Sequence, residues 1–324
     1  MVELSVTFLG TSSAAPTRER GLPSAAIQRE GELVVLDCGE GVQRQILGRG
    51  IGLNRDTTIL ITHLHGDHVT GLLGLLQTMA LAHRAKPVTV VGPAALSEWL
   101  EVTSGLLQMG LTFPLKFVRA RAGKLLTSRG FVVRCCRAEH SVEAYSYTVE
   151  ERPRPGLFYP EKAKALGVPK GALWSRLQRG KAVKVGTRTV EPGQVTGPVR
   201  PGRKIGYSGD TRPNSRLVRF FSGCDLLIFD STFAAKDADK AAERKHSTCL
   251  EAAKLASAAG VRRLALTHFS ARYRSSSSLV REARRIFPET FAASDGLTVQ
   301  VGYPGGGPAS HSMTSSRSRD SIVR

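Results

Sequence analysis

The sequence predicts an α/β fold, and three observations support this prediction. Short runs of β-branched and other apolar residues alternate with stretches of helical periodicity, and the order of strands followed by helices occurs twice along the chain. The 324 residues are 41% hydrophobic, with ordinary glycine and proline usage, as in globular proteins. A chain of this length can bury a large core, as one domain or as a domain with an insertion.

Composition also predicts a cytoplasmic protein without a membrane segment. No apolar run approaches the roughly 20 residues that a bilayer span needs. Residues 1–6 lack the basic and apolar regions of a secretion signal. The cysteines are odd in number and form no Cys-x-x-Cys pair, so we interpret them as buried or free thiols and not as a disulfide framework or zinc ribbon. They are Cys38, Cys135, Cys136, Cys224 and Cys249.

The first predicted strands lead into a turn of small residues. Residues 2–9 alternate between apolar and polar, which predicts a half-buried strand, and residues 25–28 and 33–37 are predicted as the next two strands. Asp37 stands at the end of the third strand. Its carboxylate could orient a metal-bound histidine from behind or simply form the turn, and the sequence leaves both interpretations open.

The densest group of candidate metal ligands follows an apolar strand at residues 59–61. His63, His65, Asp67 and His68 lie where this strand gives way to a loop. Neutral imidazoles and a carboxylate at this density are suited to Zn²⁺ or a similar cation, whereas turn chemistry does not call for so many imidazoles. The sequence therefore predicts a metal site with further ligands downstream.

Three later candidate ligands also follow apolar strands. His140 comes after residues 131–137, and an isolated histidine of this kind is more often structural. Asp210 and His268 likewise follow predicted strands. Together, four strand ends supply seven imidazoles and carboxylates, which we expect to converge at one edge of the sheet. Helices are predicted between the strands at residues 69–82, 93–103, 249–259 and 279–287, whereas the charged stretch 236–245 is predicted as a loop.

The positive charge is concentrated in one segment. The formal net charge of +19 favours a polyanionic partner, most simply nucleic acid, with a merely basic surface as the alternative. Residues 151–204 hold thirteen basic and three acidic residues, a net charge of +10, among frequent prolines and glycines and three interleaved aromatic residues. We interpret the segment as a protruding arm that grips phosphates, although a loop excursion without this role is the alternative.

These motifs together resemble those of a known family. The run from His63 to His68, with His140, Asp210 and His268, resembles the dinuclear zinc site of the metallo-β-lactamase superfamily. The motifs at residues 8–11, 37–41, 209–213 and 267–273 narrow the resemblance to ribonuclease Z, the tRNA 3′-processing endonuclease, and the basic arm resembles that family's flexible arm. The resemblance covers about residues 1–303.

The resemblance implies a fold and an activity. The fold would be an αββα sandwich of two mixed sheets flanked by helices over residues 1–303, interrupted by a flexible arm at 151–202 that binds tRNA. Residues 304–324, rich in Gly, Ser and Arg, are predicted to be a disordered tail. The protein would be a zinc-dependent endoribonuclease that cleaves precursor tRNA after the discriminator nucleotide and leaves a 3′-hydroxyl for CCA addition. It would be a cytoplasmic homodimer in which one subunit's arm grips tRNA cut by the other.

The resemblance also implies roles for individual residues. Two Zn²⁺ ions per subunit are implied, although the same ligands accept Mn²⁺ or Fe²⁺. The ligands of the first would be His63, His65 and His140. Those of the second would be Asp67, His68 and His268, and Asp210 would bridge both. Asp67 would also be the general base, and His246 would stabilise the transition state or assist the leaving oxygen. The predicted RNA contacts are Arg18, Arg20, Lys170, Arg176, Arg179, Lys181 and Arg272.

Two motifs depart from the family pattern. The family's His-Glu-Ala-Thr is Phe-Asp-Ser-Thr at residues 229–232, so the carboxylate expected to orient His246 is Asp230, one methylene shorter. The family's Pro-x-Lys-x-Arg-Asn loop is residues 16–21 here and ends in Gly21. That loop bears on how the RNA 3′ end is read, so the sequence leaves open whether a CCA end is rejected.

Two other function classes fit parts of the sequence. A metallo-hydrolase of a small ester, thioester, lactam or cyclic phosphodiester would share the fold but would have no use for the charged arm. A non-catalytic RNA-binding module would be expected to lose metal ligands, and here all seven are present. The arm and the ligand set together therefore favour a ribonuclease.

Overall fold

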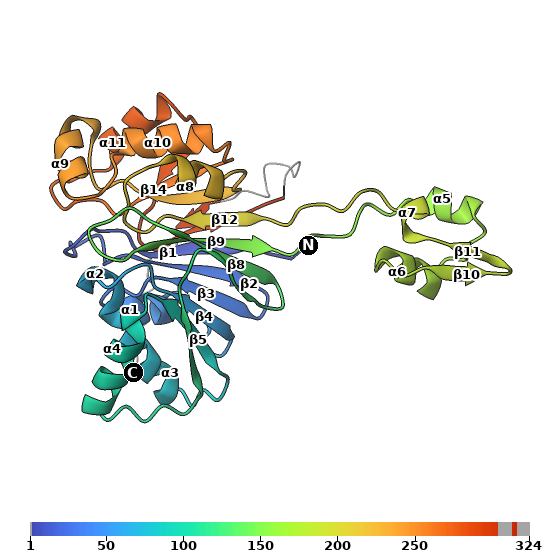
Figure 1. The fold of residues 1–324 in the computed structure, drawn as a ribbon, viewed down its shortest axis with the longest axis horizontal. Coiled ribbons are helices and arrows are strands. Elements are labelled where there is room, and N and C mark those ends of the chain that lie inside the picture. Colours follow the sequence, from blue (N-terminus) through green and yellow to red (C-terminus); the bar gives the residue numbers. More distant parts are fainter. Residues whose placement is uncertain (1, 304–312, 316–324) are drawn as a thin grey trace. The chain divides into compact units, whose positions relative to one another are not determined.

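The computed structural model describes residues 2–303 and 313–315. Their contacts divide them into two compact units: one contains the chain up to Glu150 and again from Arg203 onward, and the other is Glu151–Gly202. The first unit is a sandwich of two sheets covered by helices on both outer faces, and the second is a small unit of short helices and a hairpin (Figure 1).

The first sheet of the sandwich is mixed. Within the described residues its order is β17-β16-β1-β2-β3-β4-β5-β6. Neighbours from β3 to β6 are parallel and the other pairs are antiparallel. The strands are β1 Ser5–Gly10, β2 Ser24–Arg29, β3 Glu32–Leu36, β4 Asp56–Leu60, β5 Val88–Gly92, β6 Leu115–Arg119, β16 Leu297–Gln300 and β17 Met313–Ser315.

The second sheet is mixed as well. Its order in the described chain is β15-β14-β13-β12-β9-β8-β7, with parallel pairing from β12 to β15 and antiparallel pairing of β12 with β9 and of β7 with β8. The strands are β7 Gly123–Thr127, β8 Phe131–Arg137, β9 Tyr145–Glu151, β12 Lys204–Tyr207, β13 Leu226–Asp230, β14 Leu264–Thr267 and β15 Thr290–Ala292. Three strands of this sheet, β7, β9 and β15, are additions to those predicted from sequence.

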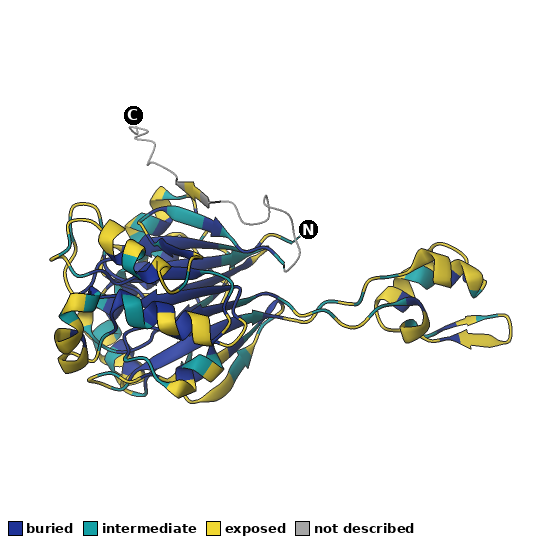
Figure 2. Cartoon of the chain, turned by 90° about the horizontal axis from the view of Figure 1, so that it is seen from above, coloured by how far each residue is buried: buried dark blue, intermediate teal, exposed yellow. Residues whose placement is uncertain are grey.

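Three apolar clusters hold the layers together because alternate strand residues face opposite sides. Val6 and Ile228 belong to the cluster between the sheets. Ile59 packs with the helices of the first sheet, and Phe229 with those of the second. Buried residues accordingly fill the strands of both sheets (Figure 2). The predicted αββα arrangement is confirmed.

Helices cover each sheet on its outer side (Figure 1). The first sheet carries α1 Val42–Gly48, α2 Gly66–Val69, α3 Gly71–Leu81 and α4 Ala95–Leu106. The second carries α8 Ser215–Phe220, α10 Cys249–Ala258 and α11 Ser277–Arg284. The short helix α9 Ala238–Glu243 precedes α10 in the chain. The helix predicted at residues 69–82 is thus two helices, and the first begins early enough to include Asp67 and His68. At their junction the backbone of Gly71 lies close to that of Gly39. A Cβ atom on Gly71 would stand only 2.0 Å from the Gly39 carbonyl oxygen, so the position requires a glycine.

The unit Glu151–Gly202 has a small core of its own. Ala163, Val168, Leu177, Val183, Val190 and Val195 are buried in it. Phe158 and Trp174 pack against this core, and the Trp174 indole donates a hydrogen bond to the Val168 carbonyl. Its elements are α5 Pro160–Ala165, α6 Ala172–Gln178, the hairpin of β10 Val183–Val185 and β11 Arg188–Val190, and α7 Pro192–Val195. The segment is therefore a folded unit and not an irregular loop.

The predicted disordered tail, 304–324, lies outside the described residues except at Met313–Ser315. Those three residues form β17, which pairs with β16. Among the helices in the described parts of the chain, none has both the length and the apolar character to cross a membrane.

Candidate metal centre

The seven predicted ligands come together at one end of the sandwich. His63, His65, Asp67 and His68 follow β4, and His140 lies between β8 and β9. Asp210 follows β12 and His268 follows β14. The predicted convergence of strand ends is present, but it joins strands of both sheets and not one edge of a single sheet.

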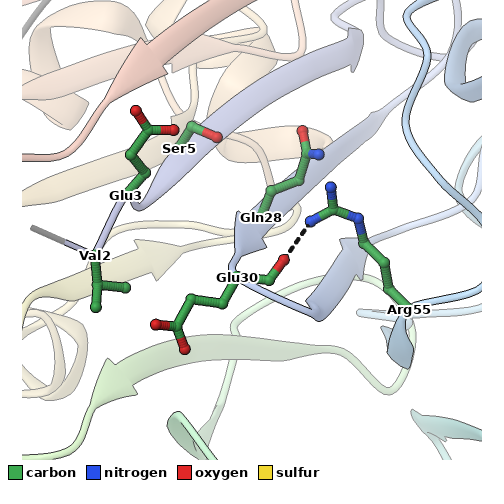
Figure 3. A pocket seen from close by; sticks show the side chains of 6 residues that line it. All are labelled: Val2, Glu3, Ser5, Gln28, Glu30 and Arg55. Carbon is green, nitrogen blue, oxygen red and sulfur yellow. Dashed lines mark hydrogen bonds between the residues drawn. The ribbon is translucent and has the colours of Figure 1, made fainter.

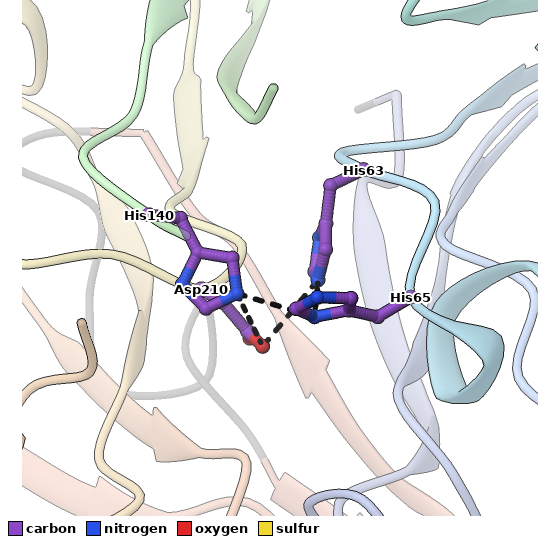
Figure 4. A group of neighbouring side chains, drawn as sticks. All are labelled: His63, His65, His140 and Asp210. Carbon is purple, nitrogen blue, oxygen red and sulfur yellow. Dashed lines mark hydrogen bonds and ion pairs between the residues drawn. The ribbon is translucent and has the colours of Figure 1, made fainter. Parts of the chain in front are cut away.

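The first group of ligand atoms comprises His63, His65, His140 and Asp210, all within 4.8 Å of one another (Figure 4). The Nδ1 of His65 lies 3.1 Å from the Nε2 of His63 and 3.2 Å from the Nε2 of His140. The Nε2 of His63 is 3.6 Å from Oδ2 of Asp210. Two ligands about 2.0–2.1 Å from a tetrahedral Zn²⁺ lie roughly 3.3 Å apart, so these spacings fit one ion.

The second group comprises Asp67, His68 and His268. Oδ2 of Asp67 lies 3.5 Å from the Nε2 atoms of both His68 and His268, which are 3.3 Å from each other. Asp210 also reaches this group, with one oxygen 3.3 Å from His68 and the other 3.3 Å from His268. The Asp210 carboxylate therefore faces both groups, as a bridging ligand must.

Two histidines have their protons fixed by partners behind the site. The Nδ1–H of His68 donates to Oδ2 of Asp37 at 2.8 Å, and the Nδ1–H of His140 donates to the Lys245 carbonyl at 3.0 Å. Because Nδ1 carries the proton, Nε2 presents a lone pair to the site in both rings. Of the two interpretations of Asp37, the structure supports the carboxylate that orients a histidine.

Threonine hydroxyls fix two further histidines. The Thr62 hydroxyl donates to Asp37 and therefore accepts from Nδ1 of His63 at 2.9 Å. The Thr232 hydroxyl donates to Asp230 at 2.7 Å and accepts from Nδ1 of His268 at 2.7 Å. Sequence reasoning did not assign these roles to the two threonines or to the Lys245 carbonyl. The signals in the sequence were that Thr62 directly precedes His63 and that Thr232 ends the motif at residues 229–232.

The donor set fits a pair of cations. Ring nitrogens face one another and two carboxylates at 3.1–3.6 Å, an arrangement that a bound cation would stabilise. Burial works against charge on Asp210, but His268 and His68 outweigh it and hold the pKa of Asp210 well below its usual range. Burial and the neighbouring histidines lower the pKa of His63 and so favour the neutral form that binds metals.

His246 stands beside the ligands and pairs with Asp230. Its Nδ1 lies 3.0 Å from Oδ2 of Asp230 and 3.9 Å from Oδ2 of Asp210, and its ring stacks on that of His268. The shorter carboxylate at position 230 therefore still reaches His246. Burial opposes protonation of this ring, but the charge and hydrogen bond of Asp230 outweigh burial and raise the pKa of His246 to about 9. At neutral pH the imidazole is thus protonated and can donate a proton.

The structure distinguishes among the predicted RNA contacts. Arg18 is exposed, and so are Lys170, Arg176, Arg179 and Lys181 in the unit 151–202. Arg20 is instead turned into the protein, where Nη1 donates to the Thr11 hydroxyl and the Ala293 carbonyl. Arg272 lies over the Phe233 ring and donates to Ser270. Arg20 therefore already has partners within the protein, and its contact with RNA stays a prediction.

A separate hollow at the beginning of β1 carries no comparable chemistry. Figure 3 shows its lining, in which Nη1 of Arg55 donates to the Glu30 carbonyl at 2.6 Å. The two carboxylates there, Glu3 and Glu30, are exposed, and no histidine or cysteine lines the hollow. The metal centre lies at the other end of the strands.

Comparison with known proteins identifies the family. A model described as "Anti-Pycsar protein Apyc1" matches residues 4–150, and one described as "Beta-lactamase superfamily domain" matches residues 179–269. Ribonuclease Z of Nitrosopumilus maritimus is 43% identical over 92% of this chain and 100% of its own length. The chain belongs to the ribonuclease Z family. Ribonuclease Z of Methanosarcina acetivorans is 41% identical over 93% of this chain and 99% of its own.

Solved structures agree with this assignment. The short form of human tRNase Z matches with a TM-score of 0.67 and 27% identity, covering 92% of this chain and all of that chain. A metallo-β-lactamase fold protein from Bacillus subtilis matches with a TM-score of 0.67 at 18% identity, which supports the fold alone. The predicted ribonuclease Z resemblance and the metallo-β-lactamase fold are both confirmed.

Proposed function

We propose that the protein is a metal-dependent endoribonuclease that removes the 3′ trailer from precursor tRNA. It would cleave after the discriminator nucleotide and leave a 3′-hydroxyl for CCA addition. The observation that carries the proposal is the complete set of seven ligand groups, with the spacing of a two-ion site, in a chain of the ribonuclease Z family. The small-substrate alternative gives no reason for the basic unit 151–202.

Two Zn²⁺ ions per subunit fit the two ligand groups best, because imidazole nitrogens predominate among the donors. When bound, such ions hold the scissile phosphate, activate a water and stabilise developing negative charge. Asp67 would take the proton of the attacking water, since its carboxylate lies at the edge of the second ligand group. Asp210 would hold the two ion positions together.

His246 would assist the departure of the leaving oxygen. Because Asp230 keeps the ring protonated at neutral pH, Nε2–H is free to donate to the departing oxygen or to a phosphate oxygen. Asp230 is itself held by the backbone N–H groups of Thr211 and Thr232, so the pair has a fixed orientation.

This role predicts a shift in the pH profile on replacing Asp230 by asparagine. In the wild type, cleavage should fall as pH rises through about 9, where His246 loses its proton. An amide removes the negative charge that raises the pKa of His246, so the alkaline limb of kcat should move to lower pH by at least about one unit. Single-turnover cleavage across pH 6–10 measures the limb. An unshifted limb would contradict the assignment.

The basic unit 151–202 would bind the RNA backbone. It contains eleven basic and three acidic residues, a net charge of +8, and nine of the basic residues are exposed. Its folded apolar core presents these side chains on a stable surface. The exposed cations on this unit support a second RNA-binding site. It would bind phosphates that are distant in the RNA sequence from the bond that is cleaved.

Binding of precursor tRNA should therefore weaken steeply with salt. Neutralising about five phosphates would give a slope of roughly −4 in a plot of log affinity against log salt concentration. Filter binding of the chelated protein between 50 and 300 mM KCl measures this slope without cleavage. A nearly flat response would contradict an interface built on phosphates.

Product mapping tests the activity itself. The protein would be incubated with a tRNA precursor that carries a 3′ extension, and the product end would be mapped at nucleotide resolution. We expect one cut after the discriminator nucleotide with a 3′-hydroxyl, abolished by a chelator and restored by Zn²⁺ or Mn²⁺. A parallel substrate ending in CCA shows whether the chain rejects mature tRNA despite Gly21 in place of the family asparagine.

We also propose a cytoplasmic homodimer. All five cysteines are buried thiols, which favours a reducing compartment. Leu81, Leu106 and Val102 on α3 and α4 are 78%, 78% and 52% exposed, an apolar surface of the kind that subunit contacts cover. Sedimentation at micromolar concentration measures the oligomeric state.

A further inference from the structure

We propose that Asp295 and Arg20 are positioning residues that fasten the loop 11–21, so that the backbone N–H of Ala14 holds Asp67 in place. The inference rests on the proposed role of Asp67 in hydrolysis. The inference gives a positioning role to Asp295 and Arg20, two charged residues that are not metal ligands.

The contact with the centre is a backbone hydrogen bond. The N–H of Ala14 donates to Oδ2 of Asp67 at 2.9 Å, and this is the same oxygen that faces His68 and His268. Ala14 adopts a φ of 57°, a left-handed conformation that an alanine takes at a cost of about 1 kcal/mol. Such a conformation persists only where the surrounding structure imposes it, so the loop must be held from elsewhere.

The loop is first tied to the chain next to His268. The N–H of Ser13 donates to the Phe269 carbonyl at 3.1 Å, and the N–H of Phe269 donates to the Thr11 carbonyl at 3.0 Å. Phe269 directly follows His268, which has a φ of 62°. The loop therefore contacts two members of the second ligand group, Asp67 directly and His268 through its neighbour.

Asp295 closes the loop at both ends. Its Oδ1 accepts a hydrogen bond from the Thr11 hydroxyl at 2.7 Å, and its Oδ2 accepts from the Gly21 N–H at 2.6 Å. The N–H of Ser12 also donates to the Gly21 carbonyl at 2.9 Å. One carboxylate from the segment between β15 and β16 thus joins residues 11 and 21, where the loop leaves and rejoins the sheet.

Arg20 braces the same junction. Nη1 reaches the Thr11 hydroxyl and the Ala293 carbonyl, and the guanidinium lies 4.6 Å from the centre of the Phe269 ring. The planar group thereby connects the loop with Ala293, which directly follows β15, and with the residue beside His268. A lysine would keep the charge but could not make the forked contacts.

Two conservative variants test the inference, Asp295→Asn and Arg20→Lys. The asparagine leaves either the Thr11 hydroxyl or the Gly21 N–H without its acceptor, because one carboxylate oxygen becomes a donor. In each of the two variants we expect kcat to fall about 10- to 100-fold. The factor should be the same with precursor tRNA and with bis(p-nitrophenyl) phosphate as substrate. The Kd for tRNA should stay within about twofold, and the chelated protein should bind Zn²⁺ more weakly in a calorimetric titration.

The pattern across the assays decides among the alternatives. If Arg20 instead contacted RNA, Arg20→Lys would weaken tRNA binding and leave hydrolysis of the small diester unchanged, which would overturn the inference. Unchanged kcat on both substrates would overturn it as well. If the wild type left precursor tRNA uncut, the proposed function would fail, yet the diester assay and the metal titration would still test the positioning role.

A matched control separates positioning from simple loss of stability. Arg84 is also buried and donates to the Leu53, Arg55 and Pro87 carbonyls, where β4 and β5 begin, at the opposite end of the strands from the metal centre. Arg84→Lys should lower Tm and leave kcat of the folded protein unchanged. If Asp295→Asn behaved like Arg84→Lys, with a lower Tm and full kcat, the positioning role would be excluded.

Discussion

Replacing Asp67 by alanine is expected to lower cleavage of precursor tRNA by at least about 10³-fold, because the variant loses both a general base and a metal ligand. The carboxylate lies 3.5 Å from two ligand nitrogens and is held by the Ala14 N–H. Nothing in its contacts suggests a part in RNA affinity, so the Kd for tRNA should stay within about threefold. Single-turnover cleavage and filter binding on the same preparation measure both quantities.

The control for Asp67 is Asp56, which lies at the opposite end of β4 from the metal centre. Asp56 begins β4, has a side chain that is 67% exposed, and pairs with Lys86 at 3.7 Å. Asp56→Ala should leave kcat and Kd unchanged, because exposed ion pairs contribute little. Asp67→Asn adds a variant of nearly the same volume that remains a weaker ligand. Undiminished turnover in Asp67→Ala would remove the residue from its proposed role.

The metal centre could be predicted because its ligands are side chains at strand ends. Asp210 and His268 follow the parallel strands β12 and β14 of the second sheet, and His68 follows β4 of the first. The ends of strands from both sheets therefore meet, although His68 and His268 are 200 residues apart. The supporting contacts could not be predicted in the same way. The Lys245 carbonyl and the Ala14 N–H act through backbone conformation, with φ of 58° and 57°, and any residue type offers those atoms.

The contacts of Arg20 within the protein could not be predicted either. Its partners, the Ala293 carbonyl and Thr11 with Asp295, depend on a pairing of β1 with β16 that joins the two ends of the domain. Local sequence carries no signal for such a contact. Residues 236–245 were predicted as a loop because they are charged, and this prediction was wrong, since they contain α9. The alanines, lysine and glutamate of α9 favour a helix even on an exposed surface.

The second large effect is expected from removing the core of the basic unit. Residues 158–196 would be replaced by Asn-Gly, a dipeptide suited to a two-residue hairpin turn. The ends of the excised segment are already paired, because Arg154 and Arg200 exchange backbone hydrogen bonds of 2.8 and 2.9 Å and the Gly197 N–H donates to the Leu157 carbonyl at 2.7 Å. The replacement should weaken tRNA binding by about 100-fold or more, since eight basic residues are lost.

Hydrolysis of bis(p-nitrophenyl) phosphate should change less than about twofold in this variant, because no metal ligand lies in the excised segment. A charge variant with the fold retained isolates the electrostatic part. Lys170, Arg176, Arg179 and Lys181 are exposed and would be changed to glutamine together, which leaves the apolar core of the unit intact. This variant should reduce the slope of log affinity against log salt by up to about three. Unchanged tRNA affinity in both variants would show that the unit 151–202 is not an RNA-binding site.

The Asp67 and arm variants are most informative when they are compared. If chemistry resides in the sandwich and recognition in the unit 151–202, Asp67→Ala loses turnover on both substrates and keeps tRNA affinity, whereas the arm replacement does the reverse. A protein whose active site alone recognised tRNA would keep its tRNA affinity in the arm replacement. A protein in which the arm shaped the metal centre would lose diester hydrolysis in the arm replacement. The two measurements on two variants therefore assign catalysis and binding to separate parts of the chain.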